Sequence, residues 1–371
     1  MEKTVKERFL TLDVFRGLTI FLMIIVNTQG GGSVPYKQMM HADWNGFTLT
    51  DLVFPSFLFA VGNAMPFAFA KFDKMPERAV VLKILKRGLL IFVIGFLLGW
   101  YATMRFGYWH ISFVDADHVR IMAVLQRIAL CYVIAALMAR FLPFRWLMIA
   151  AIVMLFIYWF LLNQFGDYTI TGNAVRRLDL RLLGINHLYR ERGIVFDPEG
   201  LLSTIPAVVN VITGYLAGAY IRDKGKNYEC LAMLALSGIA CIVVGLWWNL
   251  MLPLNKKLWT SSYVVFTSGL DLVILAFLFY WIELLQFKKG LGLFLAFGKN
   301  PLFIYILSNL FLFLLILPVQ NNMILIDWVS INVFQKLIPG PMGCLLFALA
   351  FTLLMGLFAW LMNKRKIYIR V

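Results

Sequence analysis

The sequence predicts an all-α polytopic membrane protein, and three observations support this. Hydrophobic residues make up 61% of the 371 residues, and the mean hydropathy is +0.81. Only 14% of the residues are charged, whereas soluble domains carry about 25%. Apolar runs of about 20 residues recur along the whole chain, each long enough to cross a bilayer as a helix. The strands of a β-barrel would instead alternate in polarity over about 10 residues, so a barrel is excluded.

These runs predict about ten transmembrane helices. The expected spans are 12–28, 48–70, 80–102, 119–140, 144–164, 201–220, 230–250, 262–285, 294–317 and 342–362. An even number places both termini on the same side of the membrane. The segment 323–338 would be an eleventh span and would move the C-terminus to the other side. We instead expect it to be an amphipathic helix at the outer interface.

The distribution of Lys and Arg predicts which side the termini occupy. The termini and the loops on their side hold 20 of these residues, and the opposite loops hold 10, five of them within 165–200. By the positive-inside rule, both termini are cytoplasmic and the loop that carries His41 faces the periplasm or a lumen. The same rule accounts for the net charge of +15, so we expect no nucleic-acid partner.

The first external loop holds the main candidate for chemistry. Residues 41–63, HADWNGFTLTDLVFPSFLFAVGN, begin with polar side chains and run into an apolar helix interrupted by Pro55. Polar and ionisable groups beside a membrane span are costly and indicate a functional site. With Asp43 or Asp51 orienting its ring, His41 would be a competent base near neutral pH. The alternatives are a structural histidine and carboxylates that cap a helix or pair with an arginine.

Asn27 lies at the outer end of the first predicted helix, about 21 Å along the axis from Asp13. It would stabilise negative charge that develops on a carbonyl oxygen. The glycines that follow it, within TQGGGS at 28–33, are either a flexible exit from the helix or a close approach to a ligand. Two GxxxG pairs, Gly95/Gly99 and Gly214/Gly218, are predicted helix-packing faces.

A second set of polar residues lies within the spans. Arg16 follows Asp13 by three residues, so the two share a helix face, either as an interfacial charge pair or as an anion contact. Gln126 and Arg127 lie inside an apolar run, with Arg120 seven residues before Arg127 on the same predicted face. They predict either a buried ion pair or a polar cavity.

The motif GKNPLF at 298–303 adds Lys299 and Asn300 to this set, and Pro301 would free backbone groups there. Arginine and lysine in a cavity open to the cytosol are suited to phosphates. The chain holds four cysteines without a CxxC pair, and its histidines show no ligand spacing. We therefore expect neither a disulfide nor a metal site.

Several long blocks resemble the heparan-α-glucosaminide N-acetyltransferase family. They are LDVFRG at 12–17, the 41–62 block, RIMAVLQRIALCY at 120–132, DPEGLLSTIPA at 197–207, NKKLWTSSYVVFTSGL at 255–270 and GKNPLFIY at 298–305. The resemblance implies a single transmembrane acyltransferase domain over 1–371. Lysosomal members carry an additional lumenal domain and span before this core, so the chain resembles the shorter bacterial relatives.

The resemblance also implies a reaction. Acetyl-CoA from the cytosol would donate an acetyl group to the amine of a terminal glucosamine or related amino sugar on the periplasmic side of the inner (plasma) membrane. His41 corresponds to the family's catalytic histidine and Asn27 to its asparagine at the end of the preceding helix. Arg16, Gln126, Arg127, Lys299 and Asn300 would hold the phosphates of CoA.

Other residues are candidates for the acceptor side. We expect Trp44, Asn45, Asp117 and Glu199 to bind the sugar, and Trp109 and Trp259 either to stack on sugar rings or to anchor the interface. The main alternative function is an amino-sugar transporter without chemistry. The GxxxG faces also leave a homodimer open.

Overall fold

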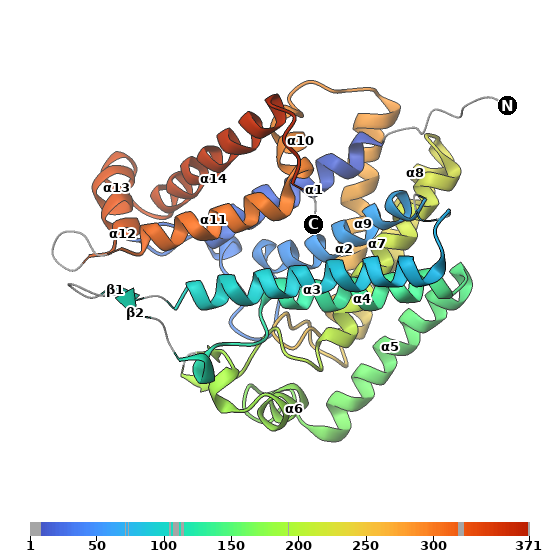
Figure 1. Cartoon of the computed structure of the whole chain (residues 1–371), viewed down its shortest axis with the longest axis horizontal. Coiled ribbons are helices and arrows are strands. Elements are labelled where there is room, and N and C mark those ends of the chain that lie inside the picture. Colours follow the sequence, from blue (N-terminus) through green and yellow to red (C-terminus); the bar gives the residue numbers. More distant parts are fainter. Residues whose placement is uncertain are drawn as a thin grey trace.

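The computed structural model describes residues 9–70, 72, 74–103, 105–106, 111–112, 115–191, 193–317 and 323–369 (Figure 1). Nearly all of its regular structure is helical. The strands are four two-residue segments in two antiparallel hairpins: β1 (Arg105–Phe106) with β2 (Ile111–Ser112), and β3 (Arg190–Glu191) with β4 (Ile194–Val195). The predicted all-α membrane architecture is confirmed at this level.

The α-helices follow one another along the chain in this order. They are α1 (Leu10–Asn27), α2 (Leu49–Phe69), α3 (Glu77–Tyr101), α4 (Val124–Phe141), α5 (Phe144–Phe165), α6 (Ala174–Leu182), α7 (Thr204–Lys224), α8 (Tyr228–Trp248), α9 (Ser261–Phe279), α10 (Gly292–Lys299), α11 (Pro301–Leu315), α12 (Leu325–Val329), α13 (Gln335–Leu337) and α14 (Pro341–Lys364). Short 3₁₀ turns cover Lys37–Met39, Ala116–His118 and Ile185–His187, and π-helical turns cover Tyr280–Leu284 and Ser330–Phe334.

Eight described helices are long and apolar enough to cross a membrane, or nine if α10 and α11 form one span, as expected of a multi-pass membrane protein. The eight are α1, α2, α4, α5, α7, α8, α9 with its π-helical turn, and α14. At the predicted 80–102 span lies α3, 25 residues long, whose five charged residues all fall within 77–87. The predicted number of ten and the sidedness stay predictions.

The segment predicted as a span at 294–317 is not one continuous helix. Between α10 and α11 the chain bends by 90° at Asn300, because Pro301 has no N–H to continue the first helix and instead starts the second. Residues 325–337 form one short helical stretch across α12 and α13. At about 1.5 Å per residue, it is too short to span a bilayer.

At the centre of the bundle α2 packs along α7, and the pairs α8–α9, α3–α4 and α1–α10 surround them. In Figure 1, β1, β2, α12 and α13 lie together at one end of the long helices. The first turn of α2 and the last turn of α1 face the same connection, residues 28–48. This connection carries His41.

Glycines set the closest helix contacts. A Cβ at Gly214 or Gly218 of α7 would overlap the carbonyl oxygen of Phe59 or Asn63 on α2, so this predicted GxxxG packing face is confirmed. In the other pair, Gly95 packs against Leu125 and Gln126 of α4, whereas a Cβ at Gly99 would meet no atom within 4 Å. Only half of the second predicted face is therefore a packing contact.

The glycines after Asn27 also serve packing, which is neither of the two predicted roles. A Cβ at Gly30 would overlap the Ser330 side chain, and one at Gly31 would overlap the Asp327 carboxylate. The Ser330 hydroxyl donates a 2.8 Å hydrogen bond to the Gly31 carbonyl. The run of glycines therefore lets the 325–337 helix lie directly on the connection after α1.

The α2–α7 contact predicts opposite effects of one substitution at two glycines. Gly214→Ala should destabilise the protein by about 1–3 kcal/mol, because the added methyl overlaps a backbone carbonyl that cannot rotate away. Gly99→Ala is the matched control and should be neutral or stabilise by up to about 1 kcal/mol, since alanine favours a helix over glycine. Thermal unfolding in detergent measures both, and equal midpoint shifts would contradict the packing role.

Candidate active site

The centre of the site is a histidine–carboxylate pair. Nδ1 of His41 lies 2.7 Å from Oδ1 of Asp51. The imidazole is 43% exposed and the carboxylate is 1% exposed. With Asp51 accepting the proton on Nδ1, Nε2 is the nitrogen left for a substrate. The exposed ring is therefore held in one tautomer by a buried acid.

Asp51 orients His41 and caps α2 at the same time. Its Oδ2 accepts hydrogen bonds from the N–H of Ala42 at 3.1 Å and from the N–H and hydroxyl of Thr48, both at 3.0 Å. Thr48 and Asp51 together form a capping box. The two roles that the sequence left open for this residue are thus both present.

Pro55 explains how the backbone of Asp51 is held. It lies inside α2, which continues from Leu49 to Phe69 and is not interrupted as the sequence suggested. A proline has no N–H to donate to the carbonyl four residues earlier, and here that carbonyl belongs to Asp51. The hydroxyl of Tyr263 on α9 donates to it instead, at 2.5 Å. The carboxylate is therefore anchored from α9 as well as from its own helix.

A network of opposite charges lies beside this pair. Arg120 binds Asp197 at 2.8 and 2.6 Å and Glu199 at 2.5 Å. Burial favours the neutral form of Glu199, but Arg120, Lys256 and Arg127 outweigh it and lower its pKa to about 2. Burial lowers the pKa of Lys256, and the charges of Glu199 and Asp51 partly oppose that shift. Lys256 thus links the charge network electrostatically to the His41 pair.

The loop of His41 is tied to two other segments that connect the long helices. The Lys257 ammonium donates to the Asp43 carbonyl at 2.8 Å and to Glu191 on β3 at 2.9 Å. The Asn255 amide donates to Asn45 at 3.0 Å, and the Gly46 N–H donates to the Leu254 carbonyl at 2.8 Å. These bonds fix the loop between residues 249–260 and the β3–β4 hairpin.

The residues predicted to bind the acceptor sugar differ in their contacts and in their exposure. Trp44 donates from Nε1 to the Tyr168 carbonyl at 2.7 Å and packs edge-on against Phe196. Asp43, Asn45 and Asp117 are exposed. Trp259 is fully buried, so the predicted stacking of a sugar ring on it is wrong. Trp109 and His110 lie outside the described residues.

Asn27 is exposed at the C-terminal end of α1. No side-chain hydrogen bond of Asn27 occurs within the described part of the chain, which leaves its amide accessible. The predicted pairing with His41 stays a prediction. Among the described residues, no group of three or more His, Cys, Asp or Glu side chains is placed to hold a metal.

The structure corrects the position of Arg127. Helix α4 begins at Val124, so Arg120 precedes the helix and does not share a face with Arg127. The fully buried Arg127 guanidinium donates to the Gly200 carbonyl at 3.0 Å and to Ser203, and lies 5.0 Å from the Trp259 ring centroid. It therefore lies on the His41 side of the bundle, not with Lys299.

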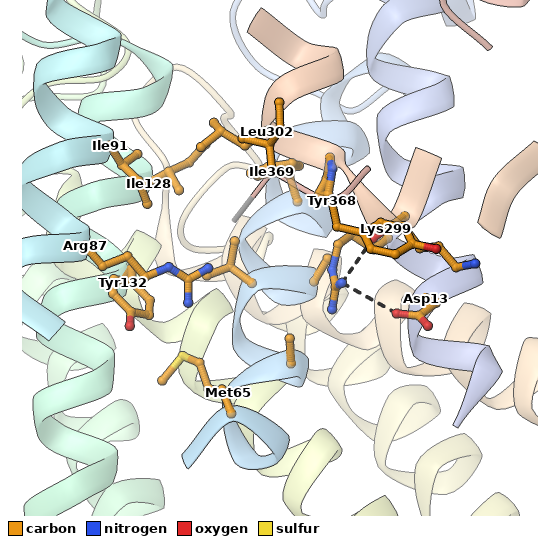
Figure 2. A pocket seen from close by; sticks show the side chains of 18 residues that line it. Asp13, Met65, Arg87, Ile91, Ile128, Tyr132, Lys299, Leu302, Tyr368 and Ile369 are labelled. Atoms are coloured by element: carbon orange, nitrogen blue, oxygen red, sulfur yellow. Dashed lines mark hydrogen bonds and ion pairs between the residues drawn. The ribbon is translucent and has the colours of Figure 1, made fainter. Parts of the chain in front are cut away.

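A cavity of about 480 Å³ opens at the other end of α2. Its walls are α2 from Phe57 onward, the first half of α4, parts of α1 and α3, the α10–α11 bend and residues 368–369. In Figure 2, Arg87 and Tyr132 lie on one wall and Lys299, Tyr368 and Asp13 on the facing wall. The volume is within the usual range of about 300–1,000 Å³ for ligand pockets.

Three cationic side chains line this cavity. Arg16 donates to the Gly298 carbonyl at 3.2 Å and lies 3.7 Å from Asp13. Arg87 is exposed and lies 4.8 Å from the centroid of Tyr132. Lys299 donates to Asn363 at 2.8 Å. The cavity is thus suited to an anion with several charges.

Besides Arg127, two further residues predicted to bind CoA, Asn300 and Gln126, do not line the cavity. The fully buried Asn300 uses its side-chain amide to bind the backbone of the C-terminal segment. Gln126 is fully buried, and neither its amide oxygen nor its amide nitrogen has a partner within the described structure. It packs against Gly95, one turn (about 6 Å) along α3 from Ile91, which lines the cavity.

The cavity and the His41 pair are close along α2. Phe57 lines the cavity and follows Asp51 by six residues, which is about 9 Å along the helix axis. Gln126 precedes Ile128, another cavity residue, by two positions on α4. The amide of Gln126 and the Nε and Nη1 atoms of Arg127, which have no partner among the described residues, thus lie beyond the inner end of the cavity, towards the His41–Asp51 pair.

Sequence reasoning missed three residues of these sites. Arg87 lies in the basic stretch 71–87, which predicts only the side of the membrane and no ligand. Lys256 lies in the NKK run of a block that matched the family, and this run was the available signal. Tyr368 had no local signal, because only the folded chain brings the C-terminal segment to the α10–α11 bend.

Comparison with known proteins identifies the family. Residues 8–242 match the family described as heparan-alpha-glucosaminide N-acetyltransferase, catalytic. The chain belongs to this family. The matched range includes both members of the His41–Asp51 pair and the charge network up to Glu199.

Two curated relatives are named heparan-alpha-glucosaminide N-acetyltransferase, one from Mus musculus and one from Homo sapiens. Each is 28% identical to the chain over 365 residues, which covers 81% of the chain for the mouse protein and 82% for the human one. The alignment covers 53% of each relative. The chain therefore spans about half the length of the curated relatives it matches.

A buried carboxyl supports the turn that holds Glu199 in this family member. Asp179 on α6 is fully buried, accepts a 2.9 Å hydrogen bond from the Leu201 N–H through Oδ1, and leaves Oδ2 without a partner in the described structure. Burial, reinforced by the charge of Asp197, raises the pKa of Asp179 to about 7. Between about pH 4 and pH 7, the folded protein therefore keeps Asp179 protonated, whereas the unfolded chain has lost this proton.

This shift predicts a pH-dependent stability. Between about pH 4 and pH 7 the folded state binds one more proton than the unfolded state, so the free energy of unfolding falls as pH rises. The loss is at most about 4 kcal/mol and is complete above pH 7. Asp179→Asn should remove this fall, which thermal unfolding from pH 4 to pH 8 would measure. An unchanged slope would contradict a neutral Asp179.

Proposed function

We propose that the protein is a transmembrane N-acetyltransferase that moves an acetyl group from acetyl-CoA to the amine of an amino sugar. The supporting observation is that the His41–Asp51 pair lies at the first turn of α2 and that a cation-lined cavity extends along the same helix. Phe57, at the inner end of the cavity, lies about 9 Å along the helix axis from Asp51. Family membership supports the reaction class. The donor would enter from the cytoplasm and the acceptor from the opposite side of the inner membrane.

The donor site would be the cavity. Arg16, Arg87 and Lys299 present the charge that the phosphates of CoA need, and Asp13 orients Arg16. The pantetheine arm would extend past Phe57 towards His41. Its amide groups need hydrogen-bond partners in a buried channel. Gln126 and Arg127 would supply them, because both carry buried polar atoms without a partner in the described part of the chain.

The acceptor would bind on the exposed face of His41. Trp44 and Asn45, which follow His41 closely in the chain, would supply an aromatic surface and polar groups, and the exposed Asp117 is a further candidate. Glu199 and Lys256 would contribute charge. Glucosamine carries an amine and hydroxyls, which an environment of mixed charge can bind. A terminal glucosamine or a related amino sugar is the proposed acceptor.

In the direct route, the sugar nitrogen attacks the thioester carbonyl, so that a C–N bond forms and the C–S bond breaks. Nε2 of His41 takes the proton that the amine loses and returns it to the sulfur of CoA. Asp51 stabilises the imidazolium between these steps. The exposed amide of Asn27 would donate to the carbonyl oxygen as negative charge develops on it.

In the covalent route, Nε2 itself attacks the thioester, releases CoA and carries the acetyl group to the amine. The exposed ring with Nδ1 held by Asp51 suits this route equally. Incubation with radiolabelled acetyl-CoA and no sugar should label the wild type stoichiometrically if the intermediate forms. His41→Ala should then carry no label, whereas labelling of both proteins would assign the acetyl group to another residue.

Turnover by purified protein tests the function itself. Mixed with labelled acetyl-CoA and glucosamine in detergent, the wild type should produce N-acetylglucosamine. His41→Ala should lower turnover by at least about 100-fold and leave CoA binding unchanged, since the ring lies outside the cation-lined cavity.

The competing function is amino-sugar transport without chemistry. Uptake of glucosamine into liposomes that contain the wild type, together with absent acetylation, would overturn the proposal. His187 is a matched control, because it lies in another external loop and its Nδ1 is bonded to the Val119 carbonyl at 2.8 Å. His187→Ala should retain turnover.

A further inference from the structure

We infer that the C-terminal segment of the chain is part of the donor site, and that the ring of Tyr368 forms the surface on which the adenine base of CoA packs. This inference rests on the proposed function and names the residue that would recognise the nucleotide end of the donor. It starts from the position of residues 367–369, which follow the last helix and return to the cavity.

Asn300 fastens this segment at two points. Its side-chain Nδ2 donates to the Ile367 carbonyl and its Oδ1 accepts from the Ile369 N–H, both at 2.9 Å. Lys366 adopts a left-handed conformation with φ of 56°, which turns the chain back after α14. Residues 367–369 therefore lie across the bend between α10 and α11 because a buried amide pairs with their backbone as a neighbouring strand would.

The two hydrogen bonds from Asn300, which we call the clamp, hold Ile367 and Ile369 and so place Tyr368 between them on the wall of the cavity (Figure 2). Its hydroxyl donates to Asn363 Oδ1 at 3.3 Å, and the same oxygen accepts from Lys299 at 2.8 Å. The Lys299 ammonium lies 5.7 Å from the ring centroid. One side chain, Asn363, thus fixes both the aromatic ring and the cation next to it.

The other two aromatic residues of the cavity are less suited to the base. Tyr132 is 3% exposed and lies against the Arg87 guanidinium. Phe57 lies at the inner end, towards Asp51, where the thioester would be. Tyr368 is 37% exposed and lies next to the Lys299 ammonium, which can bind phosphate. An aromatic ring beside a cation matches a nucleotide, in which the base is followed by phosphate. Stacking on an aromatic face recognises a base without hydrogen bonds to its edges.

The test compares two ligands on the full-length protein in detergent. CoA carries the adenine nucleotide, and 4′-phosphopantetheine carries only the arm and one phosphate. Competition against labelled CoA gives both affinities. Tyr368→Ala should lower the affinity for CoA about tenfold, near the low end expected for a lost base–aromatic contact. Its affinity for 4′-phosphopantetheine should be unchanged. Tyr368→Phe keeps the ring and should bind both ligands as the wild type does.

Asn300→Asp tests the clamp. It keeps the acceptor for the Ile369 N–H and loses the donor to the Ile367 carbonyl, so it should weaken CoA selectively, by less than Tyr368→Ala does. If Tyr368→Ala lost affinity equally for both ligands, or kept the wild-type affinity for CoA, the inference would be overturned. A wild type that binds no CoA at all would instead overturn the proposed function, which separates the two failures.

Discussion

The rest of the site depends on the two oxygens of the Asp51 carboxylate. Oδ1 holds the His41 imidazole, and Oδ2 caps the helix that runs from this point to the other end of the bundle. A buried carboxylate is stable only when its lone pairs are satisfied, and here Ala42, Thr48 and His41 satisfy them. The same carboxylate therefore both orients the histidine and caps the start of α2.

Helix α2 converts this local arrangement into a transmembrane one. Its first turn holds the dyad, its second half lines the cation-bearing cavity, and its opposite face packs backbone-to-backbone on α7 through Gly214 and Gly218. Such contacts leave little freedom for α2 to slide or rotate, because carbonyl oxygens fill the space that side chains would occupy. The two ends of the proposed transfer path are thus fixed relative to each other by one rigid element.

The sequence predicted the helical membrane class and His41, and left its carboxylate open between Asp43 and Asp51, because polarity and proximity along the chain are local signals. Only the fold selects Asp51. The sequence misplaced Arg127, since the apolar run does not mark where the preceding connection ends and α4 begins, which is at Val124. It assigned Asn300 to a ligand, whereas the amide binds a segment 67 to 69 residues away. Lys256 was missed for the same reason, because its relation to Asp51 and Glu199 exists only in the fold.

The bend at Asn300 has an electrostatic consequence. Helix α11 begins there, and its first residues, Pro301 and Leu302, line the cavity. The first N–H groups of a helix have no partners within it, and the aligned peptide dipoles give this end about half a positive elementary charge. Part of the cavity's positive potential thus comes from the main chain. It does not depend on side-chain identity or titrate with pH, and it persists when Lys299 is bound to another group.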